Sequence, residues 1–286
     1  MPRLRTLVVL SLLAVYLIWG STYLGIRIAL ESWPPFLMSA LRFLVAGVVM
    51  YAFLRWRGVA APTPRQWRNT VVTGTLLLAA GNGLVCYAEQ TVSSSLAAVA
   101  IAGMPLFAAL FAGLYGRWPS PRDWIGIAVG FSGVILLNLG GEMRASPAGA
   151  IALVAAPLCW AFGSVWSRHQ DMPDPLMSTA AQMLTGGAVL VLVTLALGES
   201  WPAAPTWRAT AALAYLTVFG SLVAFTAYIY LLQHVRPALA TSYAYVNPPI
   251  AVALGVWLAD ERFSALELAA MVVILAGVAI ILAARR

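Results

Sequence analysis

The sequence predicts an all-α polytopic membrane protein with ten transmembrane helices, arranged as two inverted five-helix repeats around a central cavity. Three observations predict this fold. The 286 residues are 62% hydrophobic and only 9% charged, a composition that excludes a soluble domain of this length. Apolar runs long enough to cross a bilayer follow one another with short connections. Residues of the first half also recur in the same order in the second half.

The apolar runs are bounded by proline and tryptophan signals such as Trp33-Pro34-Pro35 and Pro119-Ser120-Pro121. Ten helices of about 20 residues use roughly 200 residues, which leaves no room for a soluble domain. The predicted spans are 7–29, 36–55, 68–88, 92–115, 122–140, 147–168, 175–197, 208–232, 237–259 and 264–284. The boundary at Gln90–Thr91 is the least marked. The first run has no small-residue cleavage site, so we expect a retained helix rather than a signal peptide.

The basic residues predict the orientation, and all of them are arginines. With the N-terminus inside, the inner segments hold twelve: Arg3, Arg5, Arg55, Arg57, Arg65, Arg68, Arg117, Arg122, Arg168, Arg236, Arg285 and Arg286. The outer segments hold four: Arg27, Arg144, Arg208 and Arg262. Positive charge is retained on the cytoplasmic side, so both termini are predicted to be cytoplasmic. This distribution explains the net charge of +7, and no nucleic-acid partner is expected.

Matched residues define the two repeats, 1–141 and 146–286. Trp19-Gly20 in the first span corresponds to Trp160-Ala161 in the sixth, and Leu37-Met38-Ser39 to Leu176-Met177-Ser178. Pro105 corresponds to Pro248, 143 positions later. Because five helices per half is an odd number, the second copy must enter the membrane upside down. Inverted repeats of this kind are typical of carriers with a site at their interface.

The stretch from Tyr243 to Pro249 predicts a broken helix at the binding site. Pro248 and Pro249 remove backbone donors, and Asn247 can bond the carbonyls released. Irregular backbone at membrane depth is tolerated where it lines a cavity. We therefore expect Tyr243 and Asn247 in the site, with Pro248 and its counterpart Pro105 shaping the helices.

Other polar and aromatic residues inside the spans are further site candidates. Tyr16, Trp19 and Tyr23 fall on one face of the first helix, where they either pack against another helix or form a cavity wall. Trp160 and Ser164 share a face of the related sixth helix. An unpaired amide in hydrocarbon is costly, so Asn82 must face protein or water.

Arg42 is the one basic residue well inside a predicted span. A charge at this depth is costly and is usually paired or functional. It lies near the outer end, so it can snorkel, cap carbonyls or pair with Glu31. We favour a structural or gating role over direct substrate contact.

The combined motifs resemble the drug/metabolite transporter superfamily, EamA type. The motifs are Trp19-Gly20-Ser21, Pro34 leading to Arg42, Pro105 after an Ala/Ser-rich helix, and Pro248 followed by Asp260-Glu261. Within it, the aromatic-rich spans look most like the YddG group of bacterial inner-membrane exporters. The resemblance implies export of amino acids and related metabolites through a central cavity. It covers the whole chain, although no short motif fixes the substrate.

We predict an inner-membrane secondary transporter, monomeric or weakly dimeric, that exports small metabolites by alternating access. Amino acids, including aromatic ones, are the expected substrates. A carrier of the same fold for drugs or nucleotide-type metabolites is the alternative. An enzyme or a scaffold is disfavoured, because the sequence shows no nucleophile–base pair, metal-ligand cluster or phosphate loop, and no cofactor is expected. No acidic residue lies mid-span, so we expect transport that does not strictly require a proton gradient.

Overall fold

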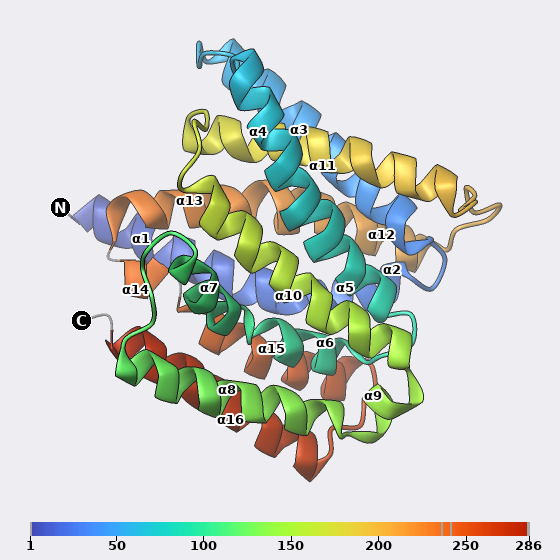
Figure 1. The fold of residues 1–286 in the computed structure, drawn as a ribbon. Coiled ribbons are helices and arrows are strands. Elements are labelled where there is room, and N and C mark those ends of the chain that lie inside the picture. Colours follow the sequence, from blue (N-terminus) through green and yellow to red (C-terminus); the bar gives the residue numbers. More distant parts are fainter. Residues whose placement is uncertain (1, 236, 241, 285–286) are drawn as a thin grey trace.

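The computed structural model describes residues 2–235, 237–240 and 242–284, and every regular element in them is a helix (Figure 1). Of the predicted inner arginines, Arg236, Arg285 and Arg286 lie outside the described residues. The first half crosses the bundle five times. Its elements are α1 (Pro2–Ala14), π-helix η1 (Val15–Trp19), α2 (Gly20–Ala29), α3 (Pro35–Trp56), α4 (Pro64–Gly74), π-helix η2 (Thr75–Asn82), α5 (Gly83–Ala88), α6 (Ser94–Ile101), α7 (Met104–Gly113) and α8 (Pro121–Asn138).

The second half repeats this order after the short connecting helix α9 (Gly141–Ala145). Its elements are α10 (Pro147–Ser167), α11 (Pro175–Ala196), α12 (Trp207–Tyr215), π-helix η3 (Leu216–Val223), α13 (Ala224–His234), α14 (Pro237–Ala240), α15 (Tyr243–Leu258) and α16 (Ala265–Ala284). The third crossing of each half contains a π-helix, η2 in one and η3 in the other. The all-helical, two-repeat membrane fold is therefore confirmed.

Four crossings, those that start with α4, α8, α10 and α11, begin where the sequence places a capping residue before a proline. The Thr63 hydroxyl accepts from the backbone N–H of Gln66, whose side chain accepts from the Thr63 N–H in return. Ser120 and Asp123 make the same reciprocal pair at the start of α8. A proline at the first helical position loses no hydrogen bond, since that N–H has no partner in a helix. These local signals explain why the predicted starts at 122, 147 and 175 lie within one residue of the observed ones. The start predicted at 68 is wrong by four residues, because the helix begins at Pro64.

Glycines allow equivalent helices of the two halves to pack so closely that their backbones are in contact. At the α8–α16 contact, a Cβ added to Gly277 would lie 2.6 Å from the Gly126 carbonyl oxygen. At the α3–α11 contact, a Cβ added to Gly47 would lie 3.0 Å from the Leu184 nitrogen. Small residues at such contacts are the usual means of close helix packing in membranes. The second helices of the two halves thus pair with each other, and so do the fifth.

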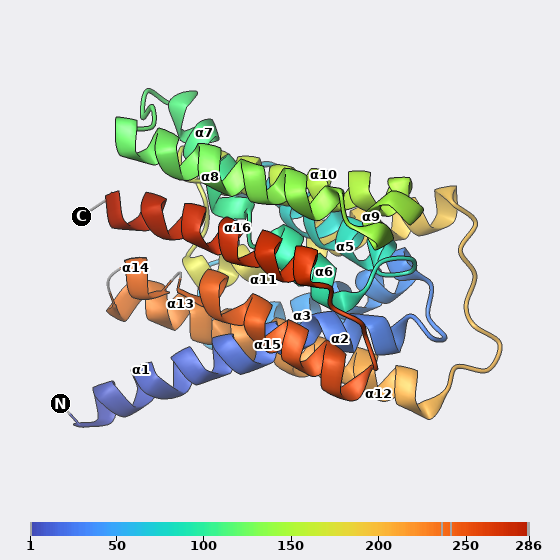
Figure 2. The ribbon, with the colours of Figure 1, turned by 90° about the horizontal axis from the view of Figure 1, so that it is seen from below.

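The first helix of each half packs against the other half. Helix α2 contacts α12 and α15, and α10 contacts η2, α5, α6 and α7. This exchange brings the first, third, fourth, sixth, eighth and ninth crossings together around the centre of the molecule. The start of α1 and the end of α16 lie at the same end of the bundle, as Figures 1 and 2 show. We call this the terminal end and the opposite one the distal end.

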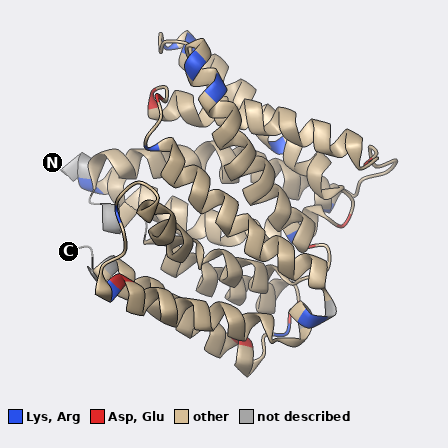
Figure 3. Ribbon diagram, in the orientation of Figure 1, with Lys and Arg blue, Asp and Glu red and all other residues tan. Residues whose placement is uncertain are grey.

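Seven of the helical stretches are long and apolar enough to cross a membrane, and α15 and most of α16 form shorter apolar helices. Most charged residues lie near the two ends of the bundle (Figure 3). Among the described residues there is one ion pair, Arg208 to Glu31 at 3.7 Å, both well exposed. Arg42 therefore does not pair with Glu31, which was one of the roles considered for it.

Two features of the fourth and ninth crossings differ from expectation. The fourth is interrupted at Ala102–Gly103, so Pro105 lies in the first turn of α7. The break predicted at Pro248 is misplaced, because α15 runs from Tyr243 through Pro248 and Pro249, and the interruption precedes Tyr243. A proline removes the bond to the carbonyl four residues back, and membrane helices tolerate this loss where neighbours or water satisfy the carbonyl.

Candidate functional site

A cavity lies at the centre of the bundle, between the two repeats. It contains about 910 Å³ of space not occupied by protein atoms, open solvent at its mouth included. Both halves contribute to its wall. The lining residues are Trp19, Thr22, Tyr23, Ile26, Arg42, Phe43, Leu78, Asn82, Val85, Ala98, Ile101, Ala102, Met104, Pro105, Pro157, Trp160, Phe225, Tyr243, Ala244, Asn247 and Pro248.

The cavity wall follows the repeat. Trp19 of η1 and Trp160 of α10, which are equivalent positions, both line it. Pro105 and Pro248 also face it as a pair. The offset of 143 that joins those prolines also joins Met104 to Asn247 and Asn82 to Phe225, and all four of these residues line the cavity. At both of these positions one half supplies an amide and the other an apolar side chain, so the symmetric fold encloses an asymmetric site.

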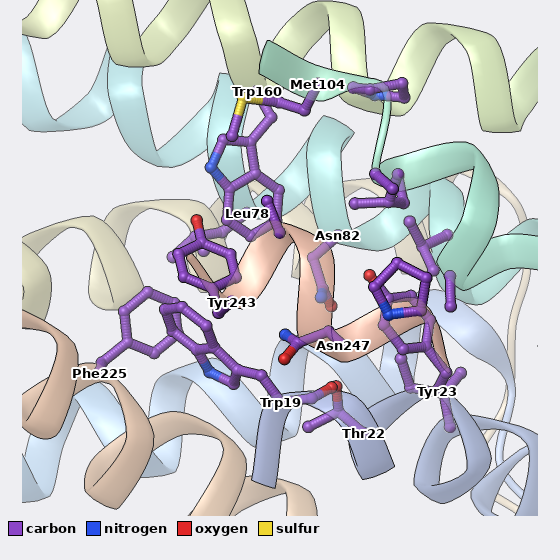
Figure 4. A pocket seen from close by; sticks show the side chains of 18 of the residues that line it. Trp19, Thr22, Tyr23, Leu78, Asn82, Met104, Trp160, Phe225, Tyr243 and Asn247 are labelled. Carbon is purple, nitrogen blue, oxygen red and sulfur yellow. The ribbon is translucent and has the colours of Figure 1, made fainter. Parts of the chain in front are cut away.

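An aromatic cluster forms one side of the cavity. The Trp19 ring meets Tyr243 edge to face at a centroid distance of 5.0 Å and Phe225 at 5.1 Å. Its indole Nε1–H donates to the Gly220 carbonyl in η3 at 3.1 Å. Trp19 is thereby fixed to the eighth crossing, with its ring left as an apolar wall. Figure 4 shows Trp160 and Met104 on the other side of the space.

Two side-chain amides lie between these walls, and Figure 4 shows both pointing into the same space. With its amide oriented to satisfy its neighbours, Asn247 Nδ2 donates to the carbonyls of Tyr16 at 3.2 Å and Tyr243 at 3.3 Å. These are not the Ala244 and Tyr245 carbonyls, whose helical donors the two prolines remove. This orientation leaves the Asn247 Oδ1 available to a solute. Asn82 Oδ1 accepts from the Cys86 thiol at 3.6 Å.

Arg42 brings a positive charge to the cavity wall. Its side chain is 3% exposed, and Nε donates to the Ser221 hydroxyl in η3 at 2.9 Å. Its buried Nη1 has no hydrogen-bond partner among the residues that the structure describes. None of the lining residues is acidic. A buried guanidinium with a free donor and no carboxylate partner is costly, so it favours an anionic group in the cavity.

The structure brings most of the predicted site residues together. Trp19, Tyr23, Asn82, Trp160, Tyr243 and Asn247 line the cavity with Pro105, Pro248 and Arg42. Ser164 is not among the lining residues, and neither is Tyr16, whose hydroxyl bonds Ser242. Tyr16 does not line the cavity because it lies in η1, where the wider π-helical turns rotate the residues before Trp19 away from the face expected for an α-helix.

Sequence reasoning missed several residues that line the cavity. Thr22, Phe225 and Met104 are among them, and the repeat offset was the available signal for the last two. Pro157 lies inside α10 and lines the cavity as well. Glu89, which follows α5 and lies just outside the predicted span 68–88, is not among the lining residues. Its side chain is completely buried.

Comparison with known proteins identifies the family. The sequence profile described as the EamA-like transporter family matches residues 6–139 and again residues 147–283. The chain belongs to this family. The uncharacterized inner membrane transporter YedA of Escherichia coli (strain K12) is 46% identical over 272 residues, which cover 95% of this chain and 89% of that protein. The uncharacterized transporter YoaV of Bacillus subtilis (strain 168) is 24% identical over 258 residues, 88% of each chain.

A solved crystal structure has the same fold as the transporter. It matches with a TM-score of 0.69 at 24% sequence identity, over 98% of this chain and 99% of the other. At that identity the likeness concerns the fold alone. Family membership and the names of the relatives indicate a transporter rather than an enzyme. The cavity between the repeats is thus its candidate substrate site.

Proposed function

We propose that the transporter exports small metabolites, most readily amino acids including aromatic ones, across the inner membrane by alternating access. The observation that carries the substrate class is Arg42, a buried guanidinium in the cavity wall without an acidic residue among those that line it. This position favours a contact with the solute over the structural or gating role expected from the sequence. A carboxylate on the solute supplies the missing counter-charge for the guanidinium. A cationic drug meets repulsion at the same place.

The rest of the cavity suits the remaining parts of an amino acid. The rings of Trp19, Trp160 and Tyr243 enclose an apolar or aromatic side chain. The oxygens of Asn82 and Asn247 accept from an ammonium group. Because these polar groups are few and fixed, they orient a solute while the aromatic wall accepts side chains of different size.

Alternating access is supported by the packing at the distal end of the cavity. The distal end is closed by one large apolar cluster drawn from both halves, which includes Ile26, Trp33, Val85, Leu96, Leu153 and Leu216. Two carboxylates from the second half also hold the distal end closed, through hydrogen bonds to the first half. Glu199 accepts from the backbone of Leu37 at 2.7 Å, and Glu261 accepts from that of Ser94 at 2.8 Å. Opening this end requires the two halves to separate there.

The three π-helices, η1, η2 and η3, are the segments expected to change conformation when the two halves separate. Trp19 ends η1, Asn82 ends η2, and η3 holds the partners of both Trp19 and Arg42. π-Helical turns carry weaker backbone bonding and are frequent at functional sites. Each π-helix is thus next to the cavity, where rotation of a half-helix would change its shape.

The experiment that tests the substrate class is counterflow in vesicles containing the purified transporter. Radiolabelled L-phenylalanine should accumulate against internal unlabelled amino acids and not against phenethylamine, its analogue without the carboxylate. Arg42→Met should abolish this preference, and Arg42→Lys should retain part of it. Equal counterflow with both solutes, or a preference for cationic drugs, contradicts the proposal.

A further inference from the structure

Glu89 is the buried charged group that the proposed cycle does not use. It directly follows α5, one turn beyond the cavity-lining Val85, at the closed distal end. Its side chain is 0% exposed, and neither carboxylate oxygen has a hydrogen-bond partner among the described residues. An ionised carboxylate in this state has lost its hydration without gaining a hydrogen bond. A protonated carboxyl avoids most of that cost.

The groups that face Glu89 come from both halves. Arg27 of α2 donates from Nη1 to the Glu89 backbone carbonyl at 2.7 Å, and its guanidinium makes no ion pair with the Glu89 carboxyl. Glu261, in the turn after α15, and Tyr23 of α2 lie within electrostatic reach, as does Cys86 on α5 itself. Burial raises the pKa of the Glu89 carboxyl well above its ordinary value, Glu261 raises it further, and Arg27 lowers it in part.

Glu261 connects this group to the closure of the distal end. Its carboxylate accepts from the backbone N–H and hydroxyl groups of both Ser94 and Ser95, at the start of α6. This Glu261 clamp joins the ninth crossing to the fourth. While Glu89 is neutral, it exerts no net charge repulsion on the clamp. Once Glu89 is ionised, two carboxylates share one poorly solvated region, which opposes the closed arrangement.

We propose that Glu89 is a proton-binding site whose protonated carboxyl stabilises the closed distal end, and whose deprotonation favours its opening. The proton passes from the carboxyl to water that enters from the distal side as the two halves separate. The proposal rests on the alternating access proposed above. It adds that pH on the distal side sets the balance between the closed and open states. Glu89 has a higher pKa in the closed state than in the open state. Between these two pKa values, the ratio of closed to open protein shifts by up to about tenfold per pH unit.

The first test needs no substrate. Infrared spectra of the purified transporter in lipid report the carbonyl stretch of a protonated carboxyl. At neutral pH the wild type should show such a band that Glu89→Gln lacks and that Glu31→Gln, an exposed control at the same end, retains. Raising the pH should remove the band from the wild type. Identical bands in the wild type and Glu89→Gln between about pH 5 and about pH 8 would overturn the proposal.

A second variant covers the case in which Glu89→Gln does not fold. Arg27→Gln removes the positive charge that favours ionised Glu89 and leaves the carboxyl in place. The band of this variant should persist to higher pH than that of the wild type. An unchanged midpoint would contradict the assignment of the band to Glu89, since a carboxyl far from Arg27 would not respond to this change.

The effect on transport is read from exchange of radiolabelled L-phenylalanine with equal pH on both sides of the vesicle. Exchange by the wild type should accelerate as the pH rises, whereas Glu89→Gln should exchange slowly at every pH. The same pH dependence in both proteins would overturn the proposal. If the wild type exchanges no L-phenylalanine at any pH, the proposed substrate is wrong, and the infrared band alone then decides the proton site.

Discussion

Replacement of Asn247 by alanine tests the proposed contact between the cavity and a solute. Asn247 is 7% exposed and holds its amide by two bonds to backbone carbonyls. The carbonyl of Tyr16 also accepts from the Gly20 N–H, so it keeps a partner in the variant. The fold should therefore survive. A lost hydrogen bond to Oδ1 costs about 0.5–1.5 kcal/mol, which weakens binding roughly two- to tenfold.

The assay is equilibrium binding of radiolabelled L-phenylalanine to purified protein in one detergent. Met104→Ala is the matched control, because Met104 is the repeat counterpart of Asn247 and lines the same cavity without a polar contact. Met104→Ala should change the affinity by an amount that depends on the size of the solute's side chain. Asn247→Ala should weaken the binding of all amino acids by a similar factor. Wild-type affinity in a folded Asn247→Ala protein would refute the reasoning.

Three further predictions concern the aromatic wall, the helix packing and pH. Tyr243→Ala should weaken binding of aromatic amino acids by about 0.5–1.5 kcal/mol more than that of alanine, measured in the same binding assay. Gly277→Val places side-chain atoms against the backbone of Gly126, so it should lower the free energy of unfolding by about 1–3 kcal/mol or more. The control Gly141→Ala should unfold like the wild type, because a Cβ at position 141 meets no atom within 4 Å. Because folding raises the pKa of Glu89, its contribution to stability is present at low pH and is lost as the pH rises through the folded value. The melting temperature of the wild type should thus fall with rising pH more steeply than that of Glu89→Gln.

The sequence predicted the helices well because composition and local signals determine them. Apolar runs and the caps at Thr63 and Ser120 act within a few residues, so they can be read without the fold. The π-helices could not be predicted in this way, because an inserted residue changes the rotation of a helix and leaves its hydrophobicity unchanged. For the same reason Tyr16 was expected on the face of Trp19.

The site was predictable where a polar side chain stood out in an apolar run, and not where tertiary packing determined it. Asn82 and Asn247 stood out because an amide in an apolar run needs a polar environment. Ser164 satisfied the same face pattern but does not line the cavity. Glu89 falls just outside the predicted span 68–88, so its burial was not predicted. The burial depends on tertiary contacts such as the bond from Arg27 of α2, a residue remote in sequence.

Photolabelling tests most directly whether the cavity between the repeats binds the substrate. The purified transporter would be irradiated with a photoreactive diazirine analogue of phenylalanine, and the adducts located by peptide mass spectrometry. The account predicts adducts on Trp19, Trp160 or Tyr243, which excess L-phenylalanine suppresses. The account would be contradicted if the adducts that excess L-phenylalanine suppresses lay instead in the open surface pocket near Gln90 and Glu199.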